Sequence, residues 1–235
     1  MPILTPEERL GECVADRYRL DSLLCAGGMG VLFRGRDLQE ERDVAIKMVK
    51  PAHAIEPDRV ARFLRETAIA RRVVHPHIAR TFDAWTDACG VPFLIMELLE
   101  GRTLACELDQ HGVLTLPQAL AIILPIVHAL EAAHTLGVIH RDVKPSNIFL
   151  CGRPDETITP KLLDFGIAKS NEVPFETQTG MLLGTPGYIA PEQAQFGDCS
   201  ELTDVWAVGA VLHRCLTGHA PHASVQASKV RAMCG

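Results

Sequence analysis

The segment Ile139–Leu150 reads Ile-His-Arg-Asp-Val-Lys-Pro-Ser-Asn-Ile-Phe-Leu. It concentrates polar side chains of different chemistry, namely His140, Arg141, Asp142, Lys144 and Asn147. Apolar residues on both sides predict a polar loop held between two short buried segments. Pro145 stiffens the middle of the loop, because its ring fixes φ and removes a donor. Such a loop can bring several polar groups to one reacting atom.

The polar groups of this loop have separate tasks in phosphoryl transfer. A carboxylate accepts the proton of a substrate hydroxyl, a lysine neutralises the moving phosphoryl group, and an amide oxygen holds Mg²⁺. The string His-Arg-Asp-x-Lys-Pro-x-Asn resembles the catalytic loop of the bacterial eukaryotic-like (Hanks-type) protein serine/threonine kinases. The resemblance extends from about Tyr18 to about Pro221 and rests on several motifs in the family order.

The composition sets limits on the function class. The chain has 235 residues and a net charge of −6, which suits one domain or two small lobes and argues against a nucleic-acid-binding surface. Its eight cysteines form no Cys-x-x-Cys pair and predict scattered reduced thiols. The N-terminus has no signal-peptide pattern, so we expect a cytoplasmic protein. The apolar window 116–133 is interrupted by polar residues and prolines and predicts a buried helix rather than a membrane span.

The resemblance implies an α+β, bilobal protein-kinase-like fold. We expect a five-stranded antiparallel sheet plus helix C in the N-lobe, and a mainly helical C-lobe that lacks its last helices. Short apolar runs predict strands at 18–24, 31–35, 44–49, 78–82 and 91–96. Helical spacing of apolar residues predicts helices over 57–74 and 116–136. Residues 1–17 are expected to form an N-terminal leader before a kinase domain over 18–235, with the N-lobe at 18–98 and the C-lobe at 99–235.

A glycine-rich turn at 25–30 lies between the first two predicted strands. In kinases such a turn covers the ATP phosphates, because glycine lets backbone N–H groups approach closely. By resemblance, the nucleotide would contact Leu24, Ala26, Gly27, Gly28, Gly30, Leu32, Ala45, Lys47, Glu97 and Leu99. Cys25 replaces the first family glycine. The alternative for the turn alone is an ordinary hairpin.

Lys47 and Glu66 match the ion pair that orients the phosphate-binding lysine in active kinases. Lys47 would reach the α- and β-phosphates, and Ala45 would pack on the base. The alternatives are an edge-strand lysine that extends to water, and a salt bridge from Glu66 to an arginine one turn away.

Asp164 begins an Asp-Phe-Gly string and, with Asn147, would hold the Mg²⁺ that bridges the ATP phosphates, with Mn²⁺ as an alternative ion. Thr177 and Thr179 are the predicted autophosphorylation sites. Arg141 would pair with the added phosphate and order the loop. The alternative is two solvated threonines.

The segment 184–193 ends in Ala-Pro-Glu-Gln and resembles the substrate-docking loop of the family, while Asp204 would anchor the catalytic loop. The resemblance implies an ATP-dependent kinase for protein Ser/Thr hydroxyls, with Asp142, Lys144, Lys47 and Glu66 as catalytic residues. Its partners would be protein substrates and a second copy for trans-autophosphorylation. The alternative is a truncated, weakly active or inactive kinase-like module that binds a nucleotide or a partner. A small-molecule kinase is disfavoured by the docking loop.

Overall fold

The computed structural model of the chain describes residues 5–27, 30–49, 57–87, 90–152, 157–164, 186–196 and 199–221. The chain divides into two compact units. The first unit combines Met1–Val74 with Ala79–Leu99, and the second combines His75–Ile78 with Glu100–Gly235. The short segment His75–Ile78 therefore packs with the second unit although it lies between parts of the first.

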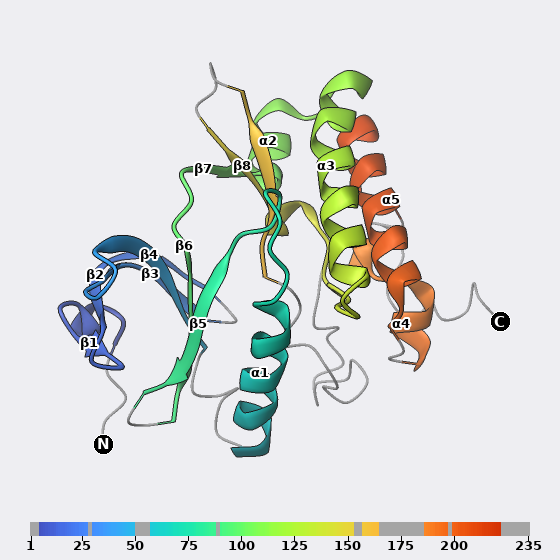
Figure 1. The fold of residues 1–235 in the computed structure, drawn as a ribbon. Helices are drawn as coiled ribbons and strands as arrows, with labels where there is room; N and C mark the ends of the chain where they lie inside the picture. Colours follow the sequence, from blue (N-terminus) through green and yellow to red (C-terminus); the bar gives the residue numbers. More distant parts are fainter. Residues whose placement is uncertain are drawn as a thin grey trace. The chain divides into compact units, whose positions relative to one another are not determined.

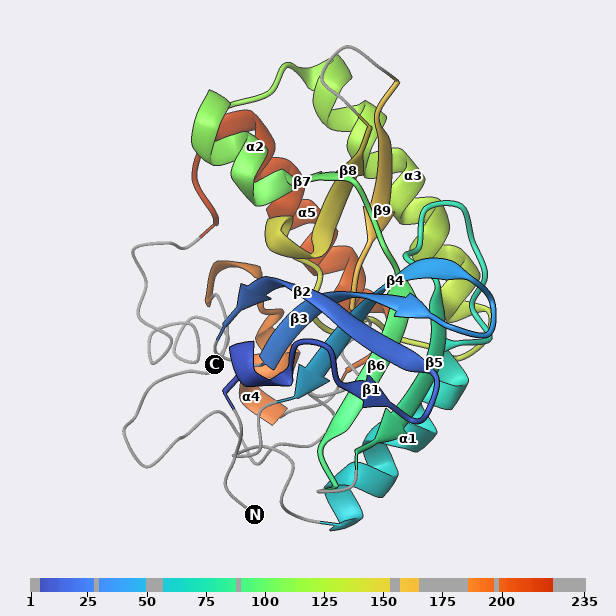
Figure 2. The same ribbon diagram turned by 90° about the vertical axis from the view of Figure 1, so that its left-hand side faces the viewer.

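The first unit is built on an antiparallel sheet with the strand order β1-β2-β3-β4-β6-β5 (Figure 2). The strands are β1 (Cys13–Val14), β2 (Tyr18–Ala26), β3 (Gly30–Asp37), β4 (Arg42–Val49), β5 (Thr81–Thr86) and β6 (Pro92–Glu97). Four of the five predicted strands are present as β2, β3, β4 and β6, whereas β5 overlaps the predicted strand 78–82 only at Thr81 and Phe82. Side chains alternate between the two faces of each strand. One face carries a buried cluster of Val14, Tyr18, Leu20, Phe33, Val44, Ile46, Met48, Phe93 and Ile95.

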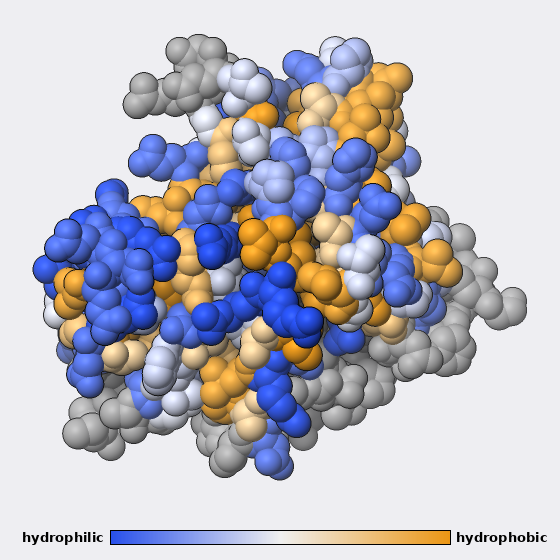
Figure 3. Space-filling view, in the orientation of Figure 1, coloured by the Kyte–Doolittle hydropathy of each residue, from blue (hydrophilic) through white to orange (hydrophobic). Residues whose placement is uncertain are grey.

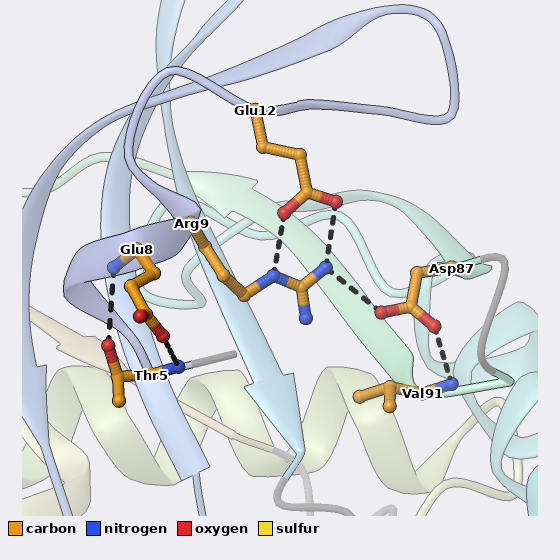
Figure 4. A network of polar contacts seen from close by, with 6 residues as sticks. All are labelled: Thr5, Glu8, Arg9, Glu12, Asp87 and Val91. Carbon is orange, nitrogen blue, oxygen red and sulfur yellow. Dashed lines mark hydrogen bonds and ion pairs between the residues drawn. The ribbon is translucent and has the colours of Figure 1, made fainter. Parts of the chain in front are cut away.

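Part of the segment expected to form a leader pairs with this sheet. β1 pairs with Tyr18 and Arg19 and adds a sixth strand at the edge. Figure 4 shows how the preceding turn is attached: Arg9 binds the carboxylate of Glu12, and its Nη2 lies 2.9 Å from Oδ2 of Asp87. A two-residue strand is too short to leave a periodic pattern in the sequence, so this pairing could not be predicted from it.

The helix of the first unit, α1 (Pro57–Ala70), packs against β5 and β6. Its buried residues Phe63, Thr67 and Ala70 recur at helical spacing, and the Thr67 hydroxyl donates to the Phe63 carbonyl oxygen at 2.8 Å. Glu66 lies on the same side of the helix and is partly buried. The side of α1 that packs on the sheet therefore carries one acidic residue among apolar ones.

The second unit is mainly helical, as predicted. Its helices are α2 (Leu104–His111), α3 (Leu116–His134), α4 (Pro191–Phe196) and α5 (Glu201–Thr217). The two long helices, α3 and α5, lie side by side (Figure 1). α3 begins where the backbone N–H of Thr115 donates to Oε1 of Gln118 at 2.9 Å, and it continues through Pro125 to His134.

By length and composition alone, α3 could cross a membrane. In this helix 39% of the apolar window is buried inside the second unit, where α3 packs against α5 and β9. The buried residues are Ala119, Ile122, Ile123, Ile126, Ala129, Leu130 and Ala133. This spacing is that of a core helix with one face toward its neighbours.

A small antiparallel sheet in the second unit holds the ends of the polar loop. It has the order β7-β8-β9, with β7 (Gly101–Thr103), β8 (Ile148–Cys151) and β9 (Thr159–Leu162). At Gly101 φ is +143°, and a Cβ there would overlap the Leu150 carbonyl oxygen, so only glycine fits. Because β8 starts directly after Asn147 and pairs with β9, the end of the loop is fixed against the strand that leads to Asp164.

One side of α5 is apolar and exposed. Among the described residues, Leu202 is 71% exposed, Val205 is 63% exposed and Trp206 is 41% exposed, whereas Val211 is fully buried. Exposed apolar residues on α3 include Leu116 and Leu124, and Figure 3 shows orange surface in the region of these helices. α5 thus carries apolar side chains beyond those that pack against other described residues.

Candidate active site

The polar loop brings its carboxylate, lysine and amide into direct contact. Nζ of Lys144 lies 2.9 Å from Oδ2 of Asp142. Nδ2 of Asn147 donates to the Asp142 carbonyl oxygen at 2.8 Å and to Oδ2 of the same residue at 3.1 Å. The three residues predicted to act together are therefore assembled within the second unit. Charge-assisted bonds from a lysine and an amide restrict the Asp142 side chain to one orientation.

The pairing of β8 with β9 places Asn147 beside the residue before Asp164. Ile148 pairs with Leu162, and the backbone N–H of Leu163 donates to the Asn147 carbonyl oxygen at 2.8 Å. Asp164 follows directly with φ at +47°, a left-handed conformation that is uncommon for a residue with a side chain. The two predicted metal ligands thus flank adjacent strands of one small sheet, with Asn147 directly before β8 and Asp164 two residues after the end of β9.

Asn147 and Asp164 offer the chemistry that a magnesium ion requires. The hydrogen bonds of the Asn147 side chain to Asp142 use its nitrogen, so its amide oxygen is the atom suited to a cation. Amide and carboxylate oxygens are hard ligands, and Mg²⁺ in phosphoryl-transfer sites takes one or two such groups plus phosphates and water. Within the described residues no group of three His, Cys, Asp or Glu side chains is placed to hold a metal. The amide oxygen of Asn147 and the carboxylate of Asp164 are therefore two protein donors that suit such an ion.

His140 connects the loop to the strand leading to Asp164. Its Nε2 lies 2.7 Å from the Leu163 carbonyl oxygen, and the backbone N–H of Asp142 donates to its Nδ1 at 3.2 Å. A carbonyl oxygen can only accept and a backbone N–H can only donate, so the ring is neutral with its proton on Nε2. Burial lowers the pKa of His140 and outweighs the opposing influence of Asp204.

Asp204, near the start of α5, anchors the backbone of the loop. Its Oδ2 accepts the backbone N–H of His140 at 2.8 Å, and its Oδ1 accepts the backbone N–H of Arg141 at 2.8 Å. Nε2 of His134, the last residue of α3, also lies 2.8 Å from Oδ2. The expected anchoring role of Asp204 agrees with this geometry. The buried carboxylate has its charge stabilised by three hydrogen bonds, which offset the cost of its burial.

The first unit carries the predicted phosphate-binding lysine. Lys47 lies in β4 between Leu32 on β3 and Leu94 on β6. Ala45, two residues earlier, is buried and shares the face of the strand with Lys47, opposite the face of the buried cluster. Leu32, Ala45 and Lys47 are therefore grouped on one face of the sheet, as an adenine pocket and its phosphate ligand require.

The glycine-rich turn is described at its two ends. The backbone N–H of Gly27 donates to the Gly30 carbonyl oxygen at 2.9 Å, and no atom lies within 4 Å of the position that a Cβ on Gly27 would take. Cys25 pairs with Leu32 in the β2–β3 ladder, and Ala26 pairs with Val31. Cys25 thus adopts strand conformation, which any residue can adopt. Its replacement of the family glycine is compatible with this hairpin. Leu24 is 46% exposed in the same strand.

Glu97 and Leu99 end the first unit, where the adenine contacts are predicted. The backbone N–H of Glu97 donates to the Arg80 carbonyl oxygen at 2.8 Å. The predicted hydrogen bond between the Glu97 backbone and adenine is therefore limited to the Glu97 carbonyl oxygen, because its N–H is already bonded.

Several predicted residues lie outside the described residues. They are Gly28, the Phe-Gly part of the Asp-Phe-Gly string, Thr177 and Thr179. Arg141, the predicted partner of a phosphothreonine, is described: its Nε is buried and donates to no acceptor among the described residues.

The sequence did not single out Gln193 or Thr203. Nε2 of Gln193 donates to the Arg141 carbonyl oxygen at 2.9 Å, and the Thr203 hydroxyl donates to Oε1 of Glu192 at 3.0 Å. These bonds join residues from different elements of the second unit. Only the position of Gln193 directly after Ala-Pro-Glu could have indicated a role.

Comparison with known proteins agrees with this geometry. Residues 18–234 match the family described as protein kinase domain. The probable serine/threonine-protein kinase PknB of Corynebacterium glutamicum is 37% identical over 213 residues, which are 88% of this chain and 32% of the relative. The serine/threonine-protein kinase PknA of Mycobacterium tuberculosis is 37% identical over 219 residues, which are 92% of this chain and 50% of the relative.

A solved structure supports the fold independently. The kinase domain of Mycobacterium tuberculosis PknI has a TM-score of 0.75 and 26% identity, with 100% of this chain and 86% of that chain covered. The chain spans between 32% and 50% of the length of the curated relatives cited above. Since the family match covers nearly the whole sequence, and the loop geometry is the one the family motif predicts, the chain belongs to the protein kinase domain family.

Proposed function

We propose that the chain is an ATP-dependent protein serine/threonine kinase that transfers the γ-phosphoryl group of ATP to Ser/Thr hydroxyls of proteins. The observation that carries the proposal is the contact of Asp142 with both Lys144 and Asn147. A carboxylate held in this way can orient the substrate hydroxyl and accept its proton, with the lysine beside it to stabilise charge on the moving phosphoryl group. Positioning and electrostatics supply most of the catalysis in this reaction class.

The first unit would bind the nucleotide. Lys47 would hold the α- and β-phosphates, Glu66 would orient Lys47, and Gly27 and Gly30 would cover the phosphates with backbone N–H groups. Asn147 and Asp164 would hold Mg²⁺, or Mn²⁺ in its place, which bridges the phosphates and neutralises their charge when bound. Every one of these residue types is present in the sequence.

Activation by phosphorylation is part of the same proposal. A phosphate on Thr177 or Thr179 would attract Arg141, whose buried Nε donates to no acceptor among the described residues and could form a charge-assisted hydrogen bond. A second copy of the chain would supply this phosphate in trans. The variant Thr177→Ala with Thr179→Ala should therefore show lower activity after incubation with Mg²⁺-ATP. Activity equal to that of the wild type would remove the switch from the proposal.

The function is tested by phosphoryl transfer from radiolabelled ATP to a generic Ser/Thr-containing protein. We expect Asp142→Asn to lose transfer while it binds ATP with unchanged affinity, because the substitution removes the proton acceptor and retains the shape. Equal transfer by the wild type and the variant would contradict the proposal. A folded wild type that binds ATP and transfers nothing would favour the alternative, a kinase-like module that binds a nucleotide or a partner.

A further inference from the structure

The peptide group between Arg141 and Asp142 is held at both of its polar atoms. Its carbonyl oxygen accepts Nε2 of Gln193 at 2.9 Å, and its N–H donates to Nδ1 of His140 at 3.2 Å. A peptide group is planar, so two bonds at opposite ends fix its rotation about the chain. The orientation of this plane sets the direction in which the Asp142 side chain leaves the backbone.

This peptide also needs to be held, because the residue before it has an unfavourable backbone conformation. Arg141 has φ at +66°, in the left-handed region. Residues with a side chain persist there only when their surroundings fix them, at a cost of roughly 1–3 kcal/mol. One of the fixing bonds is from the Arg141 N–H to Asp204 at 2.8 Å, on the N-terminal side of the residue. The bond from Gln193 is its counterpart on the C-terminal side.

Gln193 reaches the loop from a different element. It lies in α4, directly after Glu192, whose Oε1 accepts the Thr203 hydroxyl of α5 at 3.0 Å. Ala190, just before α4, is fully buried. α4 is therefore attached to α5 by one residue and to the catalytic loop by the next. A displacement of α4 would pull on the Arg141 carbonyl oxygen.

We propose that Gln193 is a positioning residue whose side-chain amide holds the Arg141–Asp142 peptide and thereby couples α4 to the orientation of the Asp142 carboxylate. The inference rests on the proposed function, in which Asp142 orients the substrate hydroxyl. Gln193 does not touch the reacting atoms and acts only through the backbone of Arg141. It makes the placement of Asp142 depend on the segment that ends in Ala-Pro-Glu-Gln.

The test compares Gln193→Ala with the matched variant Gln118→Ala. Gln118 also makes hydrogen bonds through its side chain, to the backbone N–H and the hydroxyl of Thr115 at the start of α3. That end of α3 lies roughly 27 Å along the helix axis from the end that leads to the loop. Loss of one hydrogen bond corresponds to a factor of roughly two to ten. We expect Gln193→Ala to lower kcat by this factor with the KM for ATP unchanged, and Gln118→Ala to change neither.

A second readout does not require activity. Amide hydrogen exchange of residues 140–142 should be faster in Gln193→Ala, again by roughly two- to tenfold, and unchanged in Gln118→Ala. Gln193→Glu should resemble or exceed Gln193→Ala in both readouts, because a carboxylate cannot donate to the Arg141 carbonyl oxygen. Exchange in Gln193→Ala equal to that of the wild type would overturn the inference. If the exchange changes as expected while the wild type shows no phosphoryl transfer, that result would contradict the proposed function but would support the role of Gln193 in fixing the Arg141–Asp142 peptide.

Discussion

Lys144 and Asp142 form an ion pair in which Nζ lies 2.9 Å from Oδ2, with the two side chains only 14% and 17% exposed. Partial burial makes the pair stronger than a surface pair, because solvent screens it less. The lysine therefore restricts the orientation of the carboxylate.

Loss of this lysine should reduce the rate. We expect Lys144→Ala to lower kcat by about a hundredfold, the scale for one preorganised electrostatic group, with a smaller change in the KM for ATP. Because the two residues act together, Asp142→Asn combined with Lys144→Ala should be no slower than Asp142→Asn alone. Steady-state kinetics of the three variants measure this. If the rate losses of the two single variants multiply in the double variant, Lys144 acts independently of Asp142.

The folded chain should become less stable as the pH decreases below neutrality. Burial lowers the pKa of His140 in the folded chain, while in the unfolded chain the imidazole keeps its ordinary value near 6.5. Below about pH 6.5 the unfolded state thus binds a proton that the folded state does not. The contribution of His140 to the free energy of unfolding is therefore fully present above about pH 6.5 and is lost as the pH falls toward the folded-state pKa. The pKa of His75 is also lowered, chiefly by burial, and adds to the loss.

Thermal unfolding between about pH 7.5 and about pH 5.5 tests this dependence. The wild type should lose Tm over this range, and His140→Asn should start from a lower Tm and lose less. Parallel decreases in both proteins would show that another group is responsible.

Two glycines should differ in how their substitution by alanine affects stability. A Cβ on Gly35 would overlap the Arg19 carbonyl oxygen and Cδ1 of Ile46, so Gly35→Ala should destabilise the chain by about 1–3 kcal/mol. The Cβ position on Gly27 has no atom within 4 Å, so Gly27→Ala should change the free energy of unfolding by less than about 0.5 kcal/mol. Instead it should weaken ATP binding. Denaturant melts and ATP titrations separate the two effects, and a destabilised Gly27→Ala with normal affinity would contradict the assignment of the turn.

The attachment of the N-terminal turn can be measured as a coupling energy. Arg9 and Asp87 are 15% and 9% exposed, and a double-mutant cycle should give about 0.5–1 kcal/mol, less at high salt. The exposed pair Arg34–Asp43, at 49% and 38%, is the control and should give less than about 0.5 kcal/mol. A coupling at Arg9–Asp87 no larger than in the control pair would mean that the turn is not held by this contact.

The features that the sequence predicts are those whose signal is local. β2, β3, β4 and β6 and the helices α1 and α3 follow from apolar spacing and turn residues, and the polar loop follows from its motif. Asp142, Lys144 and Asn147 are close together in the sequence, so their contact follows from a single turn of chain.

The remaining features depend on contacts between distant residues. The bonds of His140 to Leu163, of Asp204 to His134 and of Gln193 to Arg141 each require the fold before their partners can be named. The edge strand β1 is two residues long and carries no period. The donation from the Glu97 N–H to Arg80 depends on how β6 lies against the chain before β5, which apolar spacing does not define.

The proposed function requires that this chain transfers phosphate through the loop around Asp142. The most direct measurement is the intact mass of the purified chain after incubation with Mg²⁺-ATP, beside Asp142→Asn, with circular dichroism to show that both are folded. We expect mass increases of whole phosphate groups in the wild type and none in the variant. A folded wild type that gains no phosphate, or a variant that gains as much as the wild type, would contradict it.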